Sequence, residues 1–301
     1  MIKQRNIFLA IVVLQLMLLA AGCRASGEYK KSDAPPRDFK ILTYNVLYGF
    51  DRGASKTAGV DWIKSQAPDV VALQELNGFT QDSLRQTAAL WGHPHSEILK
   101  EEGFPVGLTS RTEIQVIEKR LDPMYHGYLH CKTAGIHFFV IHLSPSSSQK
   151  RQSEADFLCQ QVEPLLEQGE KVVLLGDFNA FSPHDRESLD GKKALLARMS
   201  RGKNLSDGRI DYSVLERLMN VGLTDVCHQL MPEAERLAGS FPSRMVGYVK
   251  SESDQEKYSR RIDFILMNPK LAKKCTKATI SRGDIVDSIS DHYPVTVTLA
   301  L

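Results

Sequence analysis

The sequence predicts one α/β domain in which β-sheets pack face to face and helices cover their outer sides. Short apolar runs, typical of buried strands, are mixed with amphipathic helical segments, and several strands follow each other closely enough to form hairpins. The chain has 301 residues, of which 42% are hydrophobic and 25% charged, an ordinary globular composition. No repeat divides the region after Asp38, so we expect a single domain over residues 38–301.

Strands are expected in the apolar runs that are bounded by turn residues or by polar side chains. Along the chain these runs are 39–46, 69–76, 105–111, 113–121, 128–133, 135–143, 171–179, 261–267, 275–282 and 292–301. Hydrophobic residues recur at helical spacing in 56–66, 80–91, about 149–167, 193–199 and 212–220, which predicts helices there. Thr80 is a suitable N-cap, and Pro68 ends the first helix. The charged segment 250–261 is predicted to be a solvent-facing loop.

The first residues form a separate unit. Lys3 and Arg5 precede an apolar run of roughly 15 residues, shorter than the about 20 needed to cross a bilayer and typical of a secretory signal. An uncleaved membrane anchor is the alternative. The segment LAAGC, which ends at Cys23, resembles a bacterial lipobox. This resemblance implies a signal peptide over residues 1–22, lipidation of Cys23 and a flexible tether over residues 23–37.

The same resemblance predicts a location. We expect a lipid-anchored monomer at the bacterial cell envelope, and Arg24 after the lipidated cysteine favours the outer membrane or the cell surface. The remaining cysteines either pair, in one of the three ways that four cysteines allow, or stay as buried thiols. They are Cys131, Cys159, Cys227 and Cys275. None belongs to a C-x-x-C pair, so a zinc ribbon or a redox motif is not expected.

The charge balance excludes one mode of substrate binding. Lys and Arg together number 38, against 36 acidic residues. A balance so close to neutral gives no global attraction to polyanions, so a phosphate-bearing substrate has to be held by a local site.

Polar residues stand at the ends of several apolar strands. In LLGDFNAFSPHD the strand stops at Asp177 and Asn179, and Gly176 lets the backbone turn. The other such residues are Asn45, Glu75, His142, Asp263, Asp291 and His292. Each alone has a structural explanation as a turn residue, a cap or an ion-pair partner. Strand ends converge in α/β folds, however, and charges buried there require a partner or a metal, so together they predict a catalytic site.

The motifs that contain these residues resemble a known family. In order they are TYNV, ALQEL, VIHL, GDFNA, RIDFIL and SDHYPV. The ordered set is similar to the endonuclease/exonuclease/phosphatase superfamily, which includes secreted deoxyribonucleases, DNA repair nucleases, bacterial sphingomyelinases and inositol phosphate phosphatases. The resemblance covers the chain from about Asp38 onward. It implies a four-layer α/β/β/α sandwich, with two central mixed or antiparallel sheets and the active site at one edge.

The resemblance also implies a metal cofactor. A phosphodiester resists attack because its oxygens are negative, so the enzyme needs a cation on those oxygens and a base for water. Carboxylates and water suit Mg²⁺ or Mn²⁺. Glu75 is the expected principal ligand, supported by Asn45 and Asp291.

The remaining site residues are expected to act on water and phosphate. His292 is the base or a contact to phosphate, and Asp263 fixes its tautomer through the other ring nitrogen. Asp177 orients or deprotonates water, or binds a second metal. Asn179 donates from its amide to a phosphoryl oxygen, and His142 stabilises the transition state or the leaving group.

Some positions depart from the repair-type pattern. Leu47 and His142 stand where some repair enzymes have an acid and a tyrosine, which moves the resemblance toward secreted nucleases and sphingomyelinases. Glu101 and Glu102 are candidates for the acid that partners His142, and Arg111 is expected to be structural.

The expected function is a magnesium-dependent hydrolase of phosphodiester bonds, with nucleic acid favoured as substrate. A phospholipid or sphingomyelin phosphodiesterase and a sugar or inositol phosphate phosphatase are the alternatives within the fold. No basic patch with interleaved aromatics stands out, so nucleic acid would be read through shape and backbone. No long apolar hairpin tip suggests membrane insertion. A non-catalytic binding lipoprotein is a further alternative, against which the six intact acidic, amide and imidazole positions argue.

Overall fold

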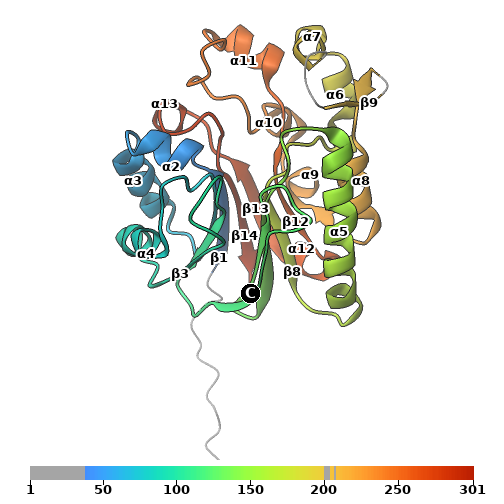
Figure 1. Cartoon of the computed structure of the whole chain (residues 1–301). Coiled ribbons are helices and arrows are strands. Elements are labelled where there is room, and N and C mark those ends of the chain that lie inside the picture. Colours follow the sequence, from blue (N-terminus) through green and yellow to red (C-terminus); the bar gives the residue numbers. More distant parts are fainter. Residues whose placement is uncertain (1–37, 200–203, 207) are drawn as a thin grey trace, which may run out of the picture. The chain divides into compact units, whose positions relative to one another are not determined.

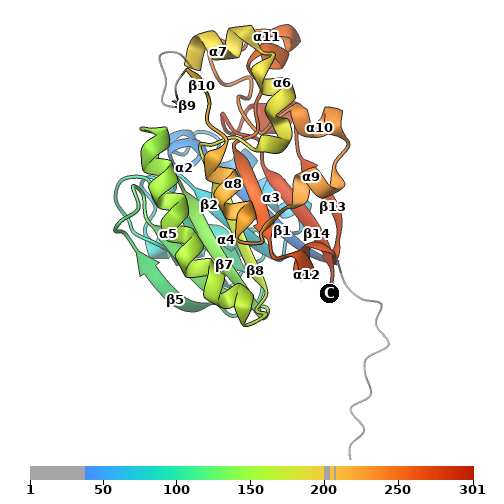
Figure 2. The same cartoon turned by 90° about the vertical axis from the view of Figure 1, so that its right-hand side faces the viewer.

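The computed structural model describes residues 38–199, 204–206 and 208–301. In this region two six-stranded sheets pack face to face, and helices cover the outer side of each sheet (Figures 1 and 2). The four-layer α/β/β/α sandwich expected from the sequence is therefore confirmed.

The first sheet has the strand order β13-β14-β1-β2-β4-β3. Only the neighbours β1 and β2 run parallel in it, and every other pair is antiparallel. The strands are β1 (Asp38–Asn45), β2 (Val70–Gln74), β3 (His95–Ile98), β4 (Gly107–Ser110), β13 (Cys275–Ile280) and β14 (Val295–Ala300).

The second sheet has the order β11-β12-β8-β7-β6-β5, and its one parallel pair is β7 with β8. Its strands are β5 (Gln115–Arg120), β6 (Tyr128–Thr133), β7 (Ile136–His142), β8 (Val172–Asp177), β11 (Thr224–Asp225) and β12 (Asp263–Met267). Every residue of β7, β8 and β12 is buried, which explains why these strands read as continuous apolar runs rather than as alternating ones.

The hydrophobic core has two main parts. Residues from both sheets interdigitate in the first, where Leu42 and Val71 belong to the same cluster as Val140 and Leu175. The second part lies between the second sheet and two helices, α5 (Ser148–Glu167) and α8 (Ser213–Asn220), which cover one side of the sandwich in Figure 1. On the opposite side lie α3 (Lys56–Gln66) and α4 (Gln81–Leu90).

The main helices begin and end where the sequence signals lie. Thr80 caps α4 by accepting a hydrogen bond from Ser83 N, in a reciprocal capping box. Ser147 caps α5 by accepting a hydrogen bond from Lys150 N. Helix α3 has the predicted bounds, and its C-cap, Ala67, is left-handed with φ of 48° before Pro68.

The prediction of a loop at 250–261 is wrong. Helix α11 (Glu252–Tyr258) forms there because Ser251 caps it through Asp254 N, and Glu252 and Asp254 lie in its first turn, where carboxylates stabilise a helix. Within the helix, Gln255 is buried. The charged composition of the segment favours a loop, but the serine cap outweighs it.

Smaller elements complete the domain. They are α2 (Leu47–Arg52), α6 (Arg186–Asp190), α7 (Lys193–Met199), α9 (Val226–Leu230), α10 (Glu233–Leu237), α12 (Pro269–Ala272), α13 (Asp284–Asp287), a 3-10 turn (Pro183–Asp185) and the hairpin β9 (Leu205–Ser206) with β10 (Arg209–Ile210). Helices α6, α7 and α11 gather beyond one end of the sheets, at the top of both views.

The cysteines of the described region are free thiols. Cys131, Cys227 and Cys275 are buried, and Cys159 is half-buried. Burial raises the pKa of the Cys131 thiol to about 12, so it is unreactive. Among the described residues no helix has the length and apolarity that a membrane crossing requires. The expected signal peptide, Cys23 and the tether all lie outside the described residues.

Candidate active site

The strand register brings three of the predicted site residues together. His142 of β7 is paired with Asp177 of β8, and Asp177 is paired in turn with Asp263 of β12. In the other sheet, Asn45 at the end of β1 is paired with Gln74, and Glu75 follows directly. The polar residues therefore converge because their strands end at matching positions.

The end of β8 needs its glycine. Gly176 has φ of 140°, and a Cβ atom there would lie 2.0 Å from the carbonyl oxygen of Ile141. Beyond it, the Asn179 backbone N–H donates to Asp177 Oδ1 at 2.8 Å, and Asn179 Nδ2 donates to the Leu143 carbonyl at 3.1 Å. The side-chain amide of Asn179 carries two N–H donors, and its bond to the Leu143 carbonyl uses one of them. The turn thus fixes both the carboxylate and the amide.

The other carboxylate oxygen of Asp177 is the centre of the site. Asp177 Oδ2 lies 3.1 Å from Asn45 Nδ2, 3.3 Å from His142 Nε2 and 3.8 Å from His292 Nε2. The residue is only 2% exposed, and burial raises the pKa of its carboxyl group, an effect that the nearby Glu75 strengthens. Burying a carboxylate is costly, and the donors Asn45 and His142, one from each sheet, offset part of that cost.

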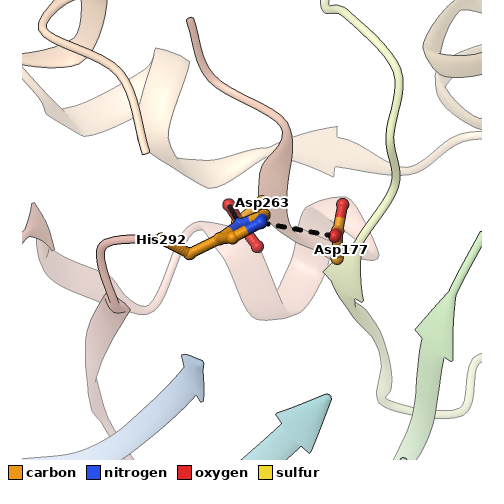
Figure 3. Close-up of side chains that lie close together, drawn as sticks. All are labelled: Asp177, Asp263 and His292. Atoms are coloured by element: carbon orange, nitrogen blue, oxygen red, sulfur yellow. Dashed lines mark hydrogen bonds and ion pairs between the residues drawn. The ribbon is translucent and has the colours of Figure 1, made fainter. Parts of the chain in front are cut away.

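His292 and Asp263 form a buried pair. His292 Nδ1 lies 2.9 Å from Asp263 Oδ2, and Figure 3 shows these two side chains close to Asp177, with a dashed line from the His292 ring to Asp177. Burial by itself lowers the pKa of His292, but the carboxylates of Asp263 and Asp177 outweigh it and raise the pKa to about 10. In the absence of other ligands the ring therefore carries a proton on each nitrogen.

Glu75 is held in a backbone conformation that few residues adopt. Its φ is 60°, and its Oε1 and Oε2 atoms accept hydrogen bonds from Asn45 Nδ2 at 3.2 Å and from the Tyr48 backbone N–H at 3.1 Å. Asn45 Oδ1 accepts from the Leu47 N–H at 3.1 Å. These bonds hold the turn α2, in which Tyr48, Gly49, Phe50 and Asp51 have left-handed dihedral angles. Such strain persists where the surroundings enforce it, often at functional sites.

Asp291 lies beside this cluster. It is half-buried, and its Oδ1 atom accepts from Ser290 Oγ at 3.4 Å. Its charge contributes to the raised pKa of His292, although it is not one of the residues that line the cleft. The Ser290 hydroxyl also donates to the Asn45 carbonyl at 2.7 Å, which ties the Asp291 segment to the end of β1.

A cleft of about 370 Å³ opens over these side chains. It is lined by Tyr48, Glu75, Phe104, Tyr125, His126, His142, Pro145, Asp177, Asn179 and His292. Tyr48, Phe104, Tyr125 and His126 are not among the site residues predicted from the sequence. These four stand in the segments after β1, between β3 and β4 and between β5 and β6, where no periodic pattern marks a functional side chain.

His142 lacks the acidic partner suggested from the sequence. Glu101 and Glu102 are exposed, and Glu101 instead accepts a hydrogen bond from the Gln81 N–H. His126 packs against His142 with its ring centroid at 4.4 Å and an angle of 26° between the planes. Burial lowers the pKa of His142 to about 4, so its ring is neutral at physiological pH. Arg111 donates to the Pro68 carbonyl at 2.8 Å and has the structural place expected of it.

The donor set fits a hard divalent cation. Ligand atoms of Asp177, Asp263 and His292 all lie within 4.8 Å of one another, and all three residues are buried. Glu75 approaches the same centre, since its Oε1 atom shares the Asn45 amide with Asp177 Oδ2. Carboxylate oxygens are the ligands that Mg²⁺ and Mn²⁺ prefer, and burying several of them together calls for a compensating positive charge.

A two-sheet sandwich that gathers carboxylates, imidazoles and amides in one cleft has the groups that a hydrolase of phosphate esters requires. The chain belongs to the Endonuclease/Exonuclease/phosphatase family, whose model matches residues 42–292. The family resemblance of the motifs is thus confirmed. Its members hydrolyse phosphate esters and depend on divalent metal ions.

Solved structures share this fold. They include an AP endonuclease from Archaeoglobus fulgidus, with 20% identity and a TM-score of 0.68. A 3′-5′ exonuclease (NExo) from Neisseria meningitidis has 22% identity and a TM-score of 0.65. Each similarity covers 87% of this chain and 100% of the other. A Neisseria NExo variant, described as a 3′ phosphatase bound to a product DNA hairpin, has 20% identity, a TM-score of 0.62 and the same coverage. No curated protein sequence matches the chain.

Proposed function

We propose that the protein is a Mg²⁺- or Mn²⁺-dependent phosphodiesterase that acts by activated water. The observation that carries this proposal is the position of Asp177. Its Oδ2 atom is within 4 Å of Asn45, His142 and His292, side chains that come from both sheets. Glu75 would be the principal metal ligand, with Asn45 and Asp291 in support, and Asp177 is placed to share the same ion.

A divalent ion, when bound, supplies positive charge for the phosphoryl oxygens and lowers the pKa of water. Asp177 then orients water or takes its proton. With a proton on each ring nitrogen, His292 donates from Nε2 to a phosphoryl oxygen. The alternative role, that of a base at Nε2, requires that a bound cation first lower the pKa of the ring. Asp263 supports either role, because its bond to Nδ1 fixes the orientation of the ring.

The remaining two residues contact phosphate in this proposal. The Asn179 amide has one N–H group bonded to Leu143, which fixes the direction of the other toward a ligand. His142 is neutral because of its burial, so it would stabilise the transition state or the leaving oxygen through a neutral N–H rather than as a cation. No covalent intermediate is required.

Nucleic acid is the substrate that we favour. Three solved structures with this fold are named as an AP endonuclease, a 3′-5′ exonuclease and a 3′ phosphatase bound to a DNA hairpin. Their identity to this chain is 20–22%, so they support the choice of substrate by analogy. A phospholipid or sphingomyelin phosphodiesterase and a sugar or inositol phosphate phosphatase are the competing candidates.

A substrate panel tests the proposal. The protein is incubated with plasmid DNA, single-stranded DNA, RNA, sphingomyelin and inositol phosphates in Mg²⁺, and again in EDTA. We expect hydrolysis of nucleic acid that EDTA abolishes and Mg²⁺ or Mn²⁺ restores. Hydrolysis that survives chelation would reject the metal mechanism. Consumption of sphingomyelin with DNA left intact would favour a phospholipid substrate over nucleic acid. If no substrate of the panel is hydrolysed, a non-catalytic binding protein is favoured.

A variant pair accompanies the panel. His292→Ala should lower turnover by about 10²–10⁴-fold, because it removes the proton-transferring ring. His95→Ala is the matched control, since His95 is a half-buried histidine on the edge strand β3 and outside the cleft. Activity of the His292 variant within tenfold of wild type would reject the role of this residue.

We also propose that the protein is a monomeric lipoprotein of the bacterial cell envelope. The support is the LAAGC segment that ends at Cys23, after a basic and then apolar leader. Cys23→Ser should move the protein from the membrane fraction to the soluble fraction with its activity retained. Unchanged membrane fractionation of this variant would contradict lipidation and favour an uncleaved anchor.

A further inference from the structure

One wall of the cleft is aromatic. Tyr48, Phe104, Tyr125 and His126 line it together with the polar residues of the site. They come from three connecting segments, after β1, between β3 and β4, and between β5 and β6. Tyr48 is 38% exposed and Tyr125 is 52% exposed, which places both among the most exposed large hydrophobic side chains of the described domain. Exposed aromatic rings beside a catalytic centre are typical of ligand contacts.

The rings form a continuous chain that reaches the catalytic residues. The Tyr48 and Phe104 centroids are 5.6 Å apart, Phe104 and His126 are 5.2 Å apart, and Tyr125 meets His126 edge-on at 4.7 Å. His126 then stacks on His142, which lies 3.3 Å from Asp177. A flat group bound against this wall would thus be one ring away from the position of the scissile phosphate.

Two kinds of ligand bind to aromatic rings, quaternary ammonium groups and nucleobases, and the charges near the wall bear on the choice between them. The Arg52 guanidinium already lies over the Tyr48 ring, 4.9 Å from its centroid. Burial lowers the pKa of His126 to about 3, and the Lys100 ammonium adds to this effect at both His126 and His142. A quaternary ammonium head group would have to displace the Arg52 guanidinium to reach the face of the Tyr48 ring that it covers. A nucleobase is neutral and can stack on the exposed rings, while Arg52 and Lys100 are the cations available to its phosphates.

We propose that Tyr48, Phe104, Tyr125 and His126 form a stacking subsite for an unpaired nucleobase next to the scissile phosphate. This inference rests on the proposed phosphodiesterase function and names its substrate class: single-stranded nucleic acid or a frayed end. In a duplex each base is covered on both faces by its neighbours, so only an unpaired base can place its face on the wall.

Binding measurements test this without requiring turnover. The probes are a fluorescein-labelled oligothymidylate and a strand of equal length in which abasic tetrahydrofuran replaces every base. Fluorescence anisotropy is measured in EDTA, which prevents metal-dependent cleavage. The wild type should bind the base-bearing strand more tightly. Tyr125→Ala and Tyr48→Ala should each weaken binding of that strand by roughly 5- to 150-fold, the range for loss of one stacked base, and leave abasic binding unchanged.

Two controls separate stacking from folding. Tyr125→Phe and Tyr48→Phe keep the ring and should retain the preference for bases. Leu90→Ala removes a side chain that is 56% exposed at the end of α4, away from the cleft, and should change neither affinity. Equal affinity of the wild type for both strands, or equal loss on both strands in the alanine variants, would overturn the subsite. Tighter binding of duplex, or competition by choline, would also overturn it.

The outcomes also distinguish the stacking subsite from the proposed phosphodiesterase function. Metal-dependent cleavage of DNA with no preference for bases would remove the stacking subsite and keep the phosphodiesterase. A preference for bases that the tyrosine variants lose, without hydrolysis of any substrate, would keep the subsite and remove the catalytic proposal.

Discussion

Asp177 and Asp263 lie directly opposite each other on the antiparallel strands β8 and β12, and the imidazole of His292 reaches the carboxylates of both. Burial raises the pKa of each carboxyl group, and the histidine partly offsets this effect. Two buried acids facing one imidazole form an arrangement that stability alone does not favour, since the desolvation of buried charges is costly. The pairing register of β8 and β12 therefore places both carboxylates beside the His292 ring.

Asp263→Asn tests the orienting bond. The amide removes the charge that holds the His292 ring, so kcat/KM for a phosphodiester should fall by about 10–100-fold while the fold persists. Steady-state kinetics and circular dichroism measure the two effects. Asp82→Asn, at an exposed position on α4, is the control and should keep full activity. A variant of Asp263 with wild-type kinetics would show that this bond does not contribute.

Gly176→Ala tests the turn that ends β8. The added Cβ would lie 2.0 Å from the Ile141 carbonyl oxygen at a φ of 140°, so we expect a loss of about 1–3 kcal/mol in the free energy of unfolding. Urea denaturation measures it. At Gly191 the nearest atom to a Cβ is 3.5 Å away and φ is −77°, so Gly191→Ala should change stability little or raise it. Similar values for both variants would contradict the strain argument.

Arg261→Met tests a buried ion-pair network below the site. Arg261 is 2% exposed and bonds Asp185 Oδ2 at 3.0 Å and Asp225 Oδ1 at 2.6 Å. Its removal leaves Asp225 without its cation and Asp185 with Arg236 alone, so unfolding should require about 3–5 kcal/mol less. Arg85→Met breaks an exposed pair with Asp82 and should cost about 1 kcal/mol or less. An equal loss in the free energy of unfolding for the Arg261 and Arg85 variants, measured by urea denaturation, would contradict the importance of burial.

His93 predicts how stability depends on pH. It is fully buried between Thr109 Oγ1 at 2.7 Å and the Pro68 carbonyl at 2.9 Å, and burial lowers its pKa from 6.5 to about 4. The unfolded state takes up a proton first, so this contribution to stability is complete above about pH 6.5 and is lost as pH falls toward 4. His93→Gln should flatten the stability profile by up to about 1.4 kcal/mol per pH unit in that window. Parallel profiles from urea denaturation would contradict this assignment.

The fold was predictable where the signal is local and long. Strands such as β7 and β8 are continuous apolar runs, and α3 and α4 have clear boundaries. The sequence does not predict β3, β11 or the β9–β10 hairpin, because each of these strands has four residues or fewer and is defined by its pairing rather than by a local pattern. It also missed α11, where a serine cap outweighs a charged composition.

The polar part of the site could be predicted because its signal is also local. Polar residues such as Glu75, Asp177 and His292 stand out because they interrupt apolar strand ends. The aromatic wall does not stand out: Tyr48 and Tyr125 reach the cleft through loops whose positions depend on tertiary contacts. The left-handed turn at Tyr48 exists because Glu75 and Asn45 accept its backbone N–H groups, which no local pattern reveals.

Binding of Mn²⁺, followed by electron paramagnetic resonance, tests most directly whether residues of both sheets meet around a divalent ion. Wild-type protein should reduce the signal of free Mn²⁺ as it binds the ion. Glu75→Gln should raise the dissociation constant at least about tenfold, while Glu101→Gln, at an exposed position outside the cleft, should leave it unchanged. Equal affinities in wild type and the Glu75 variant, or no binding by wild type, would contradict the proposed metal centre.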